Sequence, residues 1–477
     1  MTYEKKGLLL ELTGEPARDT ELAASLENAT NGSALFRRLE LSSVQKESVL
    51  DALRAGSDAN MANASAPGQS VDSQVEELRE WKRHLLSEGE SSLNKGIDDE
   101  YKSLDEAIIQ AYRWRVNTEI AKLHILQASE AGNMRSFVRW NKFVYGKPDR
   151  DIYLAALDFV ATDAEDLILE HGYDSVPGQA AQEVLDGIAE NRGDRQIIVP
   201  DETTFNEVSH DHTKAGGYYS LLLAGVHFPE GRIDQFTGEP IIRQVLGNLS
   251  SGYDIEEING STWSVKHGKR VVGQPRKYSL PLNRFAGLVL GHEIGTHILE
   301  RVNGERGPLR LVKTGLDRYE RGAEGRAIIR EQVRYDTFEK FSKTSRWVDI
   351  LRRHIAISYA CGLDDDKPKT SSETYAFMNT IDEMYQLRSQ PGDFVAAKKK
   401  ADKKTGDLIL RILKGTNGQA GGAYLKDLVY LEGNVRAWEA ARDRGPGAIS
   451  EGDHGKFDIT NPRHMDLLES VGLVASS

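Results

Sequence analysis

Three side chains that could do chemistry together lie in the apolar segment 287–304: His292, Glu293 and His297. Zinc hydrolases use two imidazoles to hold the metal and a carboxylate beside the first as a base. In the usual His-Glu-x-x-His pattern the histidines are four residues apart, which separates them by about 40° around an α-helix. The gap here is five residues, and a regular α-helix would turn the two rings about 140° apart.

A π-bulge between the two histidines would return them to one face, and such bulges often occur at functional sites. Gly295 lies in the gap and is the residue that best tolerates the distortion. The alternative is a helix with two unrelated histidines. The flanking residues are apolar, so the helix is expected to be buried, and each polar group buried without a partner would cost ~1–3 kcal/mol. The sequence therefore favours a metal site.

Composition limits the class of protein. The chain has 477 residues, of which 28% are charged and 39% hydrophobic, as in ordinary globular proteins. The net charge of −12 gives no reason to expect nucleic-acid binding, and no apolar run is long enough for a membrane span. Cys361 is the one cysteine. No intrachain disulfide can form, which fits a cytoplasmic location, and Cys361 is expected to be a structural thiol.

The texture of the chain predicts three regions: an N-terminal helical region and linker (1–72), a helical subdomain (73–195) and a catalytic domain (196–477). The small, polar residues 56–72 are the expected linker. Residues 255–282 carry the best strand signal. The expected fold is α+β and mostly helical, with a small antiparallel sheet beside the His-Glu helix. Its edge could bind an extended peptide.

Zinc needs at least one more protein ligand, and the segment 315–331 offers four acidic candidates: Asp317, Glu320, Glu324 and Glu331. Glu324 and Glu331 are seven residues apart in a predicted helix and share one face. One could bind the metal while the other orients a histidine. The residues alone leave the choice open.

At this point the chain resembles a known family. His-Glu-Ile-Gly-Thr-His at 292–297, Gly-Leu-x-x-Tyr at 315–319 and Ala-Glu-Gly-Arg-Ala at 323–327 are similar to the motifs of the QEGLA-motif metallopeptidases. That family includes bacterial proteins labelled flavohaemoglobin-expression modulators and the microtubule-associated tyrosine carboxypeptidases. Segments 143–149, 411–415 and 423–433 extend the resemblance, which spans about 100–435.

The resemblance implies a zinc ion held by His292, His297 and Glu324, with Glu293 as the general base. The chain departs from the family at Ala323 and Arg326, where glutamine and leucine are usual. Loss of the glutamine could remove a hydrogen bond to a ligand. An arginine at 326 suggests that this position faces water or an anionic group.

The function implied is that of a zinc carboxypeptidase acting on a peptide or protein C-terminal tail. Such an enzyme needs a cation for the terminal carboxylate, and the family-like segments supply Arg411, Lys414 and Lys426. Tyr424 and Tyr430 are candidates for stabilising an oxyanion.

The alternative is a zinc-containing regulatory or binding protein with little activity. Two weaker signals, Ser209–His212 and the basic run Lys398–Lys404, are expected to be an ordinary loop and a solvated helix face.

Overall fold

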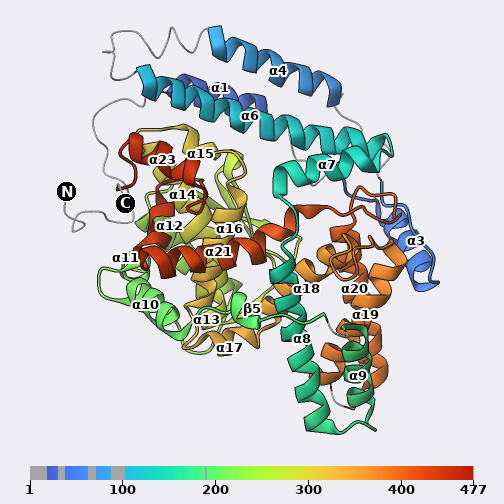
Figure 1. Cartoon of the computed structure of the whole chain (residues 1–477). Coiled ribbons are helices and arrows are strands. Elements are labelled where there is room, and N and C mark those ends of the chain that lie inside the picture. The colour runs from blue at the N-terminus through green and yellow to red at the C-terminus, as the bar shows by residue number, and fades with distance from the viewer. Residues whose placement is uncertain are drawn as a thin grey trace.

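Helices make up most of the protein, and the strands are few and short (Figure 1). The computed structural model describes residues 19–30, 38–62, 71–87, 102–188, 191–390 and 392–475. The mostly helical α+β fold expected from the sequence is confirmed.

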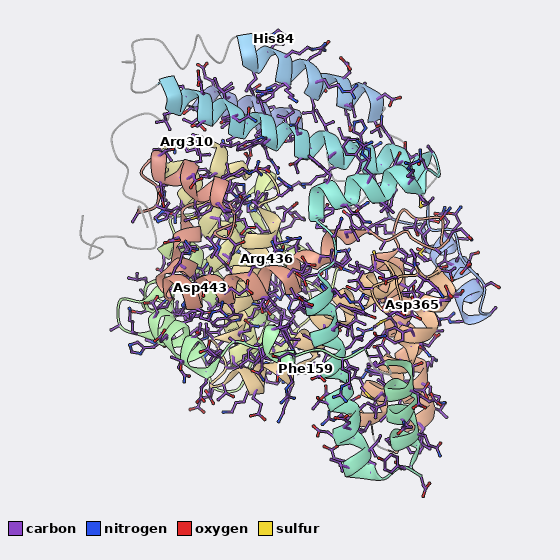
Figure 2. All side chains as sticks on the ribbon, viewed as in Figure 1. His84, Phe159, Arg310, Asp365, Arg436 and Asp443 are labelled. Atoms are coloured by element: carbon purple, nitrogen blue, oxygen red, sulfur yellow. The ribbon has the colours of Figure 1, made fainter. Side chains whose placement is uncertain are left out.

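The N-terminal helices form a layer across one end of the molecule, at the top of Figure 1: α1 (Thr20–Thr30), α4 (Val71–Ser87), α6 (Lys102–Glu130) and α7 (Met134–Tyr145). Asp19, directly before α1, fixes this layer to the rest of the protein. Its carboxylate accepts hydrogen bonds from the Tyr112 hydroxyl (2.8 Å) and from the backbone amides of Arg310 (2.7 Å) and Leu311 (2.8 Å). Figure 2 shows Arg310 at this boundary.

A second group of helices lies to the right in Figure 1 and combines segments that are distant in sequence: α3 (Ser43–Arg54), α8 (Arg150–His171), α9 (Val176–Ile188), α18 (Ser345–Ala360), α19 (Ser371–Ser389) and α20 (Phe394–Ile412). Phe159 of α8 packs edge-on against Trp347 of α18, with ring centroids 6.1 Å apart. Asp365 marks the charged loop between α18 and α19 (Figure 2). Packing therefore crosses the boundary between the predicted regions 73–195 and 196–477, and those boundaries stay predictions.

The predicted linker 56–72 is only partly described, because residues 63–70 lie outside the described part of the chain. Met61, just before that gap, is fully buried. Its backbone exchanges hydrogen bonds with the loop after α20, at Gly415 and Thr416. The start of the segment is therefore packed against the body rather than extended as a linker.

The strands form two small sheets. β1 (Arg232–Asp234) pairs antiparallel with β5 (Ser279–Pro281). In the second sheet, the order is β2 (Asp254–Ile258), β4 (Val271–Pro275) and β3 (Ser264–Lys266). β4 runs antiparallel to β3 but parallel to β2.

The prediction of a purely antiparallel sheet is therefore wrong in part. Alternation and turn residues locate strands, but they do not identify partners. β4 is the central strand, with β2 on one side and β3 on the other, and four of its five residues are buried.

The remaining helices surround the segment that contains the two histidines. α16 lies between the histidine helix η5 and α21, and contacts both. The predicted helix that carries Glu324 and Glu331 is α16, which ends at Gln332. The bounds are η3 (Arg195–Ile197), α10 (Glu202–Thr213), α11 (Tyr218–Leu222), α12 (Gln235–Asn248), η4 (His267–Lys269), α13 (Leu282–Arg284), η5 (Phe285–Ile298), α14 (Leu299–Arg306), α15 (Leu311–Thr314), α16 (Glu320–Gln332), α17 (Phe338–Ser342), η6 (Leu425–Asp427), α21 (Leu428–Arg444), α22 (Gly447–Glu451), η7 (Gly452–His454) and α23 (Pro462–Ser470).

Candidate metal centre

The helix that carries both histidines is a π-helix over its whole length, Phe285–Ile298. Its hydrogen bonds join residues five apart: the Leu299 amide donates to the Ile294 carbonyl, for example. Residues five apart consequently lie one above the other. His292 and His297 share one face, with their ring centroids 5.0 Å apart. The π geometry expected from the spacing is confirmed, and it covers fourteen residues instead of a single bulge.

Three glycines spaced four residues apart let neighbouring helices approach η5 closely. A Cβ on Gly295 would lie 1.6 Å from the Tyr218 hydroxyl, and one on Gly291 would lie 2.6 Å from the Tyr219 hydroxyl. A Cβ on Gly287 would lie 3.1 Å from the Cα of Glu331. The role of Gly295 is therefore to admit a buried tyrosine, since its own φ is not left-handed.

Glu324 of α16 completes a triad with the two histidines. Its Oε2 atom lies 3.5 Å from His292 Nε2 and 3.9 Å from His297 Nε2. The three potential ligand atoms all lie within 4.8 Å of one another. Tetrahedral zinc with bonds of 2.0–2.2 Å holds its ligand atoms about 3.3–3.6 Å apart. Within the described part of the chain, this is the one group of its kind, and it could hold a metal ion.

The charges in the triad also fit a cation. Glu324 Oε2 is buried and has no hydrogen-bond partner within the described residues. Burial alone would lower the pKa of His292, but the carboxylates of Glu324 and Glu331 outweigh it and raise that pKa to about 10. Burial would raise the pKa of Glu324, yet His292 and His297 bring it down to about 2. The site therefore favours a positive charge where a metal would lie.

Each histidine has a second carboxylate near its other ring nitrogen, an arrangement common in metal sites. Glu331 Oε1 lies 2.7 Å from His292 Nδ1, and Arg346 contacts the same oxygen at 3.0 Å. Glu300 Oε2 lies 3.8 Å from His297 Nδ1. Glu324 therefore faces both histidines, and Glu331 contacts the other ring nitrogen of His292, while the division of roles between them stays a prediction.

Arg326, where the chain departs from the family motif, is fully buried and faces anions instead of water. Its guanidinium bonds Glu300 and lies 3.3 Å from Asp453 Oδ1. Arg330, one turn further along α16, also bonds Asp453 and donates to the Gly295 carbonyl at 2.8 Å. The unusual arginine is therefore the counter-ion of the carboxylate that lies beside His297.

The other acidic candidates are engaged away from the triad. Asp317 lies 3.2 Å from His464 Nε2 and is also paired with Arg318 and Arg463. Glu320 is paired with Lys122 at 3.0 Å. Neither belongs to the group that could hold a metal.

Glu293 follows His292 directly and is half-buried. Its charge helps to raise the pKa of His292. Within the described residues, this carboxylate forms no hydrogen bond and no ion pair. It is available to water or to a substrate.

The three cations expected to bind substrate lie in different settings. Arg411 bonds Asp427, with Nη2 2.9 Å from Oδ1. Lys426 is close enough to Glu324 to help lower the pKa of that carboxyl. Lys414 is buried and lies 3.6 Å from Glu40.

The two tyrosines also differ. Tyr424 is buried, and its hydroxyl lies 3.3 Å from that of Tyr145. Tyr430 is half-buried, and the charge of Glu324 is the chief cause that raises its pKa. Of the two hydroxyls, that of Tyr430 is therefore the one whose pKa depends chiefly on Glu324.

Sequence reasoning missed three charged residues around the triad: Glu300, Arg346 and Arg353. Glu300 follows His297 by three residues, a helical spacing that could have indicated it. Arg346 and Arg353 are on α18, far from the motifs in sequence, and nothing local marks them.

The weaker sequence signals do not form a second site. His210 and His212 lie on helix α10, so the expectation of a loop is wrong. His212 is buried, its Nδ1 donates to the Val208 carbonyl (2.9 Å), and burial lowers its pKa to about 4. Burial raises the pKa of the Cys361 thiol to about 11, as expected for a structural thiol. The basic run Lys398–Lys404 is on α20, with most of its lysines exposed.

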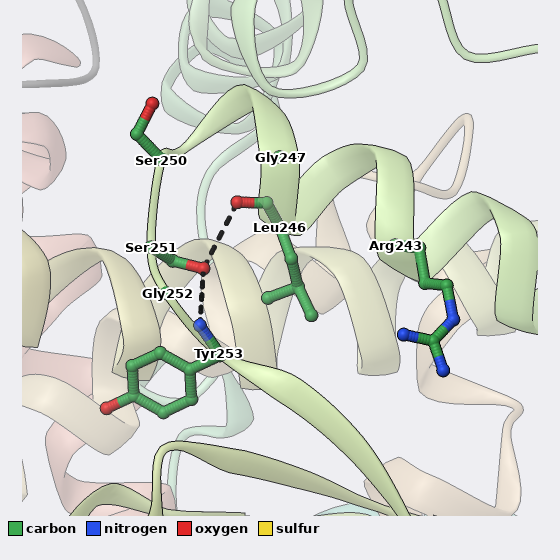
Figure 3. Close-up of a pocket in the computed structure, with 7 residues that line it drawn as sticks. All are labelled: Arg243, Leu246, Gly247, Ser250, Ser251, Gly252 and Tyr253. Carbon is green, nitrogen blue, oxygen red and sulfur yellow. Dashed lines mark hydrogen bonds between the residues drawn. The ribbon is translucent and has the colours of Figure 1, made fainter.

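A pocket of about 250 Å³ lies at the end of α12 (Figure 3). Ser251 closes its turn by donating to the Leu246 carbonyl (3.1 Å) and accepting from the Tyr253 amide (3.3 Å). Its lining includes none of the candidate metal ligands. No helix among the described residues is long and apolar enough to cross a membrane.

Comparisons with known proteins found no matching family, no similar curated protein and no similar solved structure. The case for a function therefore depends on the chemistry of the triad and the residues around it.

Proposed function

We propose that this protein is a cytoplasmic zinc-dependent metallopeptidase, and that it acts as a carboxypeptidase on a peptide or protein C-terminal tail. One observation carries the proposal. His292, His297 and Glu324 converge, from two helices, on a space that suits a metal ion, and Glu293, whose carboxylate has no hydrogen bond or ion pair among the described residues, directly follows His292.

The donor set suits zinc. Two imidazole nitrogens and one carboxylate oxygen are a common ligand set of catalytic zinc, and three protein ligands leave one position for water or substrate. Glu331 lies where it can fix the tautomer of His292 through Nδ1, so that Nε2 is directed to the metal position. A purely structural zinc site would instead need a fourth protein ligand.

The residues present can divide the steps of peptide hydrolysis between them. A bound zinc ion supplies Lewis acidity, which lowers the pKa of water towards ~7 and polarises the scissile carbonyl. Glu293 accepts a proton from the attacking water and delivers it to the leaving amine. The Tyr430 hydroxyl, held protonated by the nearby charge of Glu324, donates a hydrogen bond to the developing oxyanion.

The test combines metal analysis with amino-acid release. Zinc-loaded protein is incubated with an acetylated peptide library whose last two residues are randomised, and mass spectrometry follows release of the terminal residue. Glu293→Gln should retain zinc and lose hydrolysis by a factor of about 10² or more, because the amide cannot accept the proton. Glu339→Gln, an exposed glutamate on α17, is the matched control and should behave as wild type.

Two results would contradict the proposal. Hydrolysis by Glu293→Gln at the wild-type rate would remove Glu293 from the base role. Stoichiometric zinc in the wild-type protein without release of any residue would favour the alternative, a zinc-containing regulatory or binding protein with little activity.

A further inference from the structure

A group of positively charged side chains lies beside the triad, around Asp427 and the ring of Tyr430. Arg353 and Arg346 come from α18, which contacts η6, and Arg411 comes from the last turn of α20. The three meet because α18 and α20 pack together next to the start of α21.

Arg353 and Arg411 share one carboxylate, and they share it unequally. Arg411 binds Asp427 through both Nε and Nη2. The Nε of Arg353 lies 3.9 Å from Asp427 Oδ2, which is an ion pair but too long for a hydrogen bond. Two guanidinium groups face one carboxylate, so the cluster has an excess of one positive charge.

The donors of Arg353 are open. Within the described part of the chain its guanidinium donates no hydrogen bond, although its side chain is only 20% exposed. Burial, together with the charges of Arg411 and Arg346, lowers the pKa of Arg353, as expected for a cation that lacks full compensation. A half-buried guanidinium with free donors is suited to a bidentate bond with a carboxylate ligand.

Contacts connect Arg353 to the candidate metal centre through one aromatic ring. The Cζ of Arg353 lies 5.4 Å from the centroid of Tyr430, and that of Arg346 lies 5.9 Å from it. Arg346 in turn contacts Glu331, which lies against His292. The ring of Tyr430 and then Arg346 therefore connect Arg353 to Glu331, the carboxylate beside His292.

We propose that Arg353 binds the terminal carboxylate of the peptide and so determines specificity for free C-termini. This inference rests on the proposed function. The sequence had pointed to Arg411, but Asp427 already occupies that guanidinium from two of its nitrogens. In this arrangement Arg411 and Asp427 remain bonded to each other, and Arg353 is the member of the cluster that contacts the substrate.

Lys456 is the competing cation and provides a matched control. It is 6% exposed, and its Nζ has no carboxylate within ion-pair distance among the described residues. Its ammonium lies 5.8 Å from the ring centroid of Tyr319. Tyr319 is at the other end of α16 from Glu331. Lys456 therefore tests whether any incompletely paired cation, at a different place, could bind the terminal carboxylate.

The experiment measures binding, so that it does not depend on turnover. Zinc-loaded full-length Glu293→Gln protein is titrated with one peptide in two forms, free acid and C-terminal amide. The peptide is the best substrate from the library, or acetyl-pentaalanyl-phenylalanine if none is cleaved. The free acid should bind about tenfold or more tightly, the range of a charge-assisted bidentate bond. Adding Arg353→Gln should abolish most of that preference through weaker binding of the acid alone.

Two further variants sharpen the result. Arg353→Lys should keep part of the preference, because a lysine retains the charge but not the planar fork. Lys456→Met should keep all of it. Zinc content and thermal unfolding of each variant show that the protein is intact.

The outcomes separate this inference from the proposed function. Equal affinity for the two peptide forms, no binding of either, or an unchanged preference after Arg353→Gln would overturn the role of Arg353. Loss of the preference in Lys456→Met instead would transfer the role to that residue and also overturn it. A wild-type protein that hydrolyses nothing, while Arg353 still governs binding of the free acid, would remove the peptidase function and support the carboxylate site.

Discussion

The two histidines of the triad are supported by similar groups in very different surroundings. His292 has Glu331 and then Arg346, whose side chain is 22% exposed. His297 has Glu300 and then Arg326, both with fully buried side chains. We call these the open branch and the sealed branch. Each is a histidine, a carboxylate and an arginine, but only the open branch reaches the surface beside Tyr430.

Because the two branches differ in exposure, we expect one to stabilise the fold and the other to tune metal binding. A buried ion pair contributes little net stability, but the loss of one partner leaves an uncompensated charge and is costly. The sealed branch, tied to Asp453 and Arg330, should therefore govern folding. The open branch is partly solvated and tolerates change, so it should govern how the metal and its ligands are tuned. The predictions below test this division.

The largest effect is expected from Arg326→Leu in the sealed branch. Glu300 would be left buried without its counter-ion, and the free energy of unfolding should fall by about 3–5 kcal/mol. Denaturant unfolding measures the change. Arg346→Leu in the open branch is the counterpart and should cost less than half as much. Equal losses for the two variants would remove the distinction between the branches.

A second large effect is expected at the packing of η5. Gly295→Ala places a Cβ where the Tyr218 hydroxyl lies, so the helix or the tyrosine must move. Overpacking of this kind costs about 1–3 kcal/mol, and it should also disturb the position of His297. Adding Tyr218→Phe removes the clashing oxygen and should recover part of the stability. No loss in the single variant would show that the close approach at Gly295 is not required.

Zinc affinity should respond most to the open branch. Glu331→Gln removes the charge beside His292 Nδ1 and should weaken zinc binding about 10–100-fold, with a small change in stability. Competition with a chromophoric chelator measures the affinity. The opposite pattern, with affinity unchanged and the fold lost, would assign Glu331 to the structural task.

The free energy of unfolding should also depend on pH, through the buried residue His212. His212 is buried against Tyr218, 5.3 Å between ring centroids, and its pKa is about 4 in the folded protein. The unfolded imidazole takes up a proton below about 6.5, so the unfolded state gains protons first and stability is lost as pH falls from 6.5 towards 4. The loss should reach about 2 kcal/mol at pH 5. Urea unfolding at pH 7 and pH 5 measures it, and His212→Gln should reduce the difference. A pH dependence unaffected by that substitution would place its origin elsewhere.

The sequence predicted the local parts of this structure well. The five-residue gap between His292 and His297 predicted π geometry, because only that geometry puts both rings on one face. The helical character predicted for residues 73–195 agrees with α6 and α8. The spacing of seven predicted that Glu324 and Glu331 share one face of a helix, and both lie against His292.

What the sequence could not predict depends on contacts between distant segments. The parallel pairing of β2 with β4 is invisible in the alternation of either strand. Arg326 could be read as facing an anion, but its burial depends on Glu300 and on Asp453, 127 residues away. Arg353 meets Asp427 only because α18 packs near η6, and Lys414 faces Glu40 only because the N-terminal segment folds back over α20.

X-ray absorption at the zinc edge, on purified protein loaded with one equivalent of zinc, is the decisive measurement for the metal site. We expect one tightly bound zinc per chain, with two imidazole nitrogens and a carboxylate oxygen at ~2.0–2.2 Å. We also expect that His292→Ala, His297→Ala and Glu324→Ala each lose the bound metal. A protein that takes up no stoichiometric zinc, or one whose zinc environment is unchanged in those three variants, would contradict the proposed zinc site.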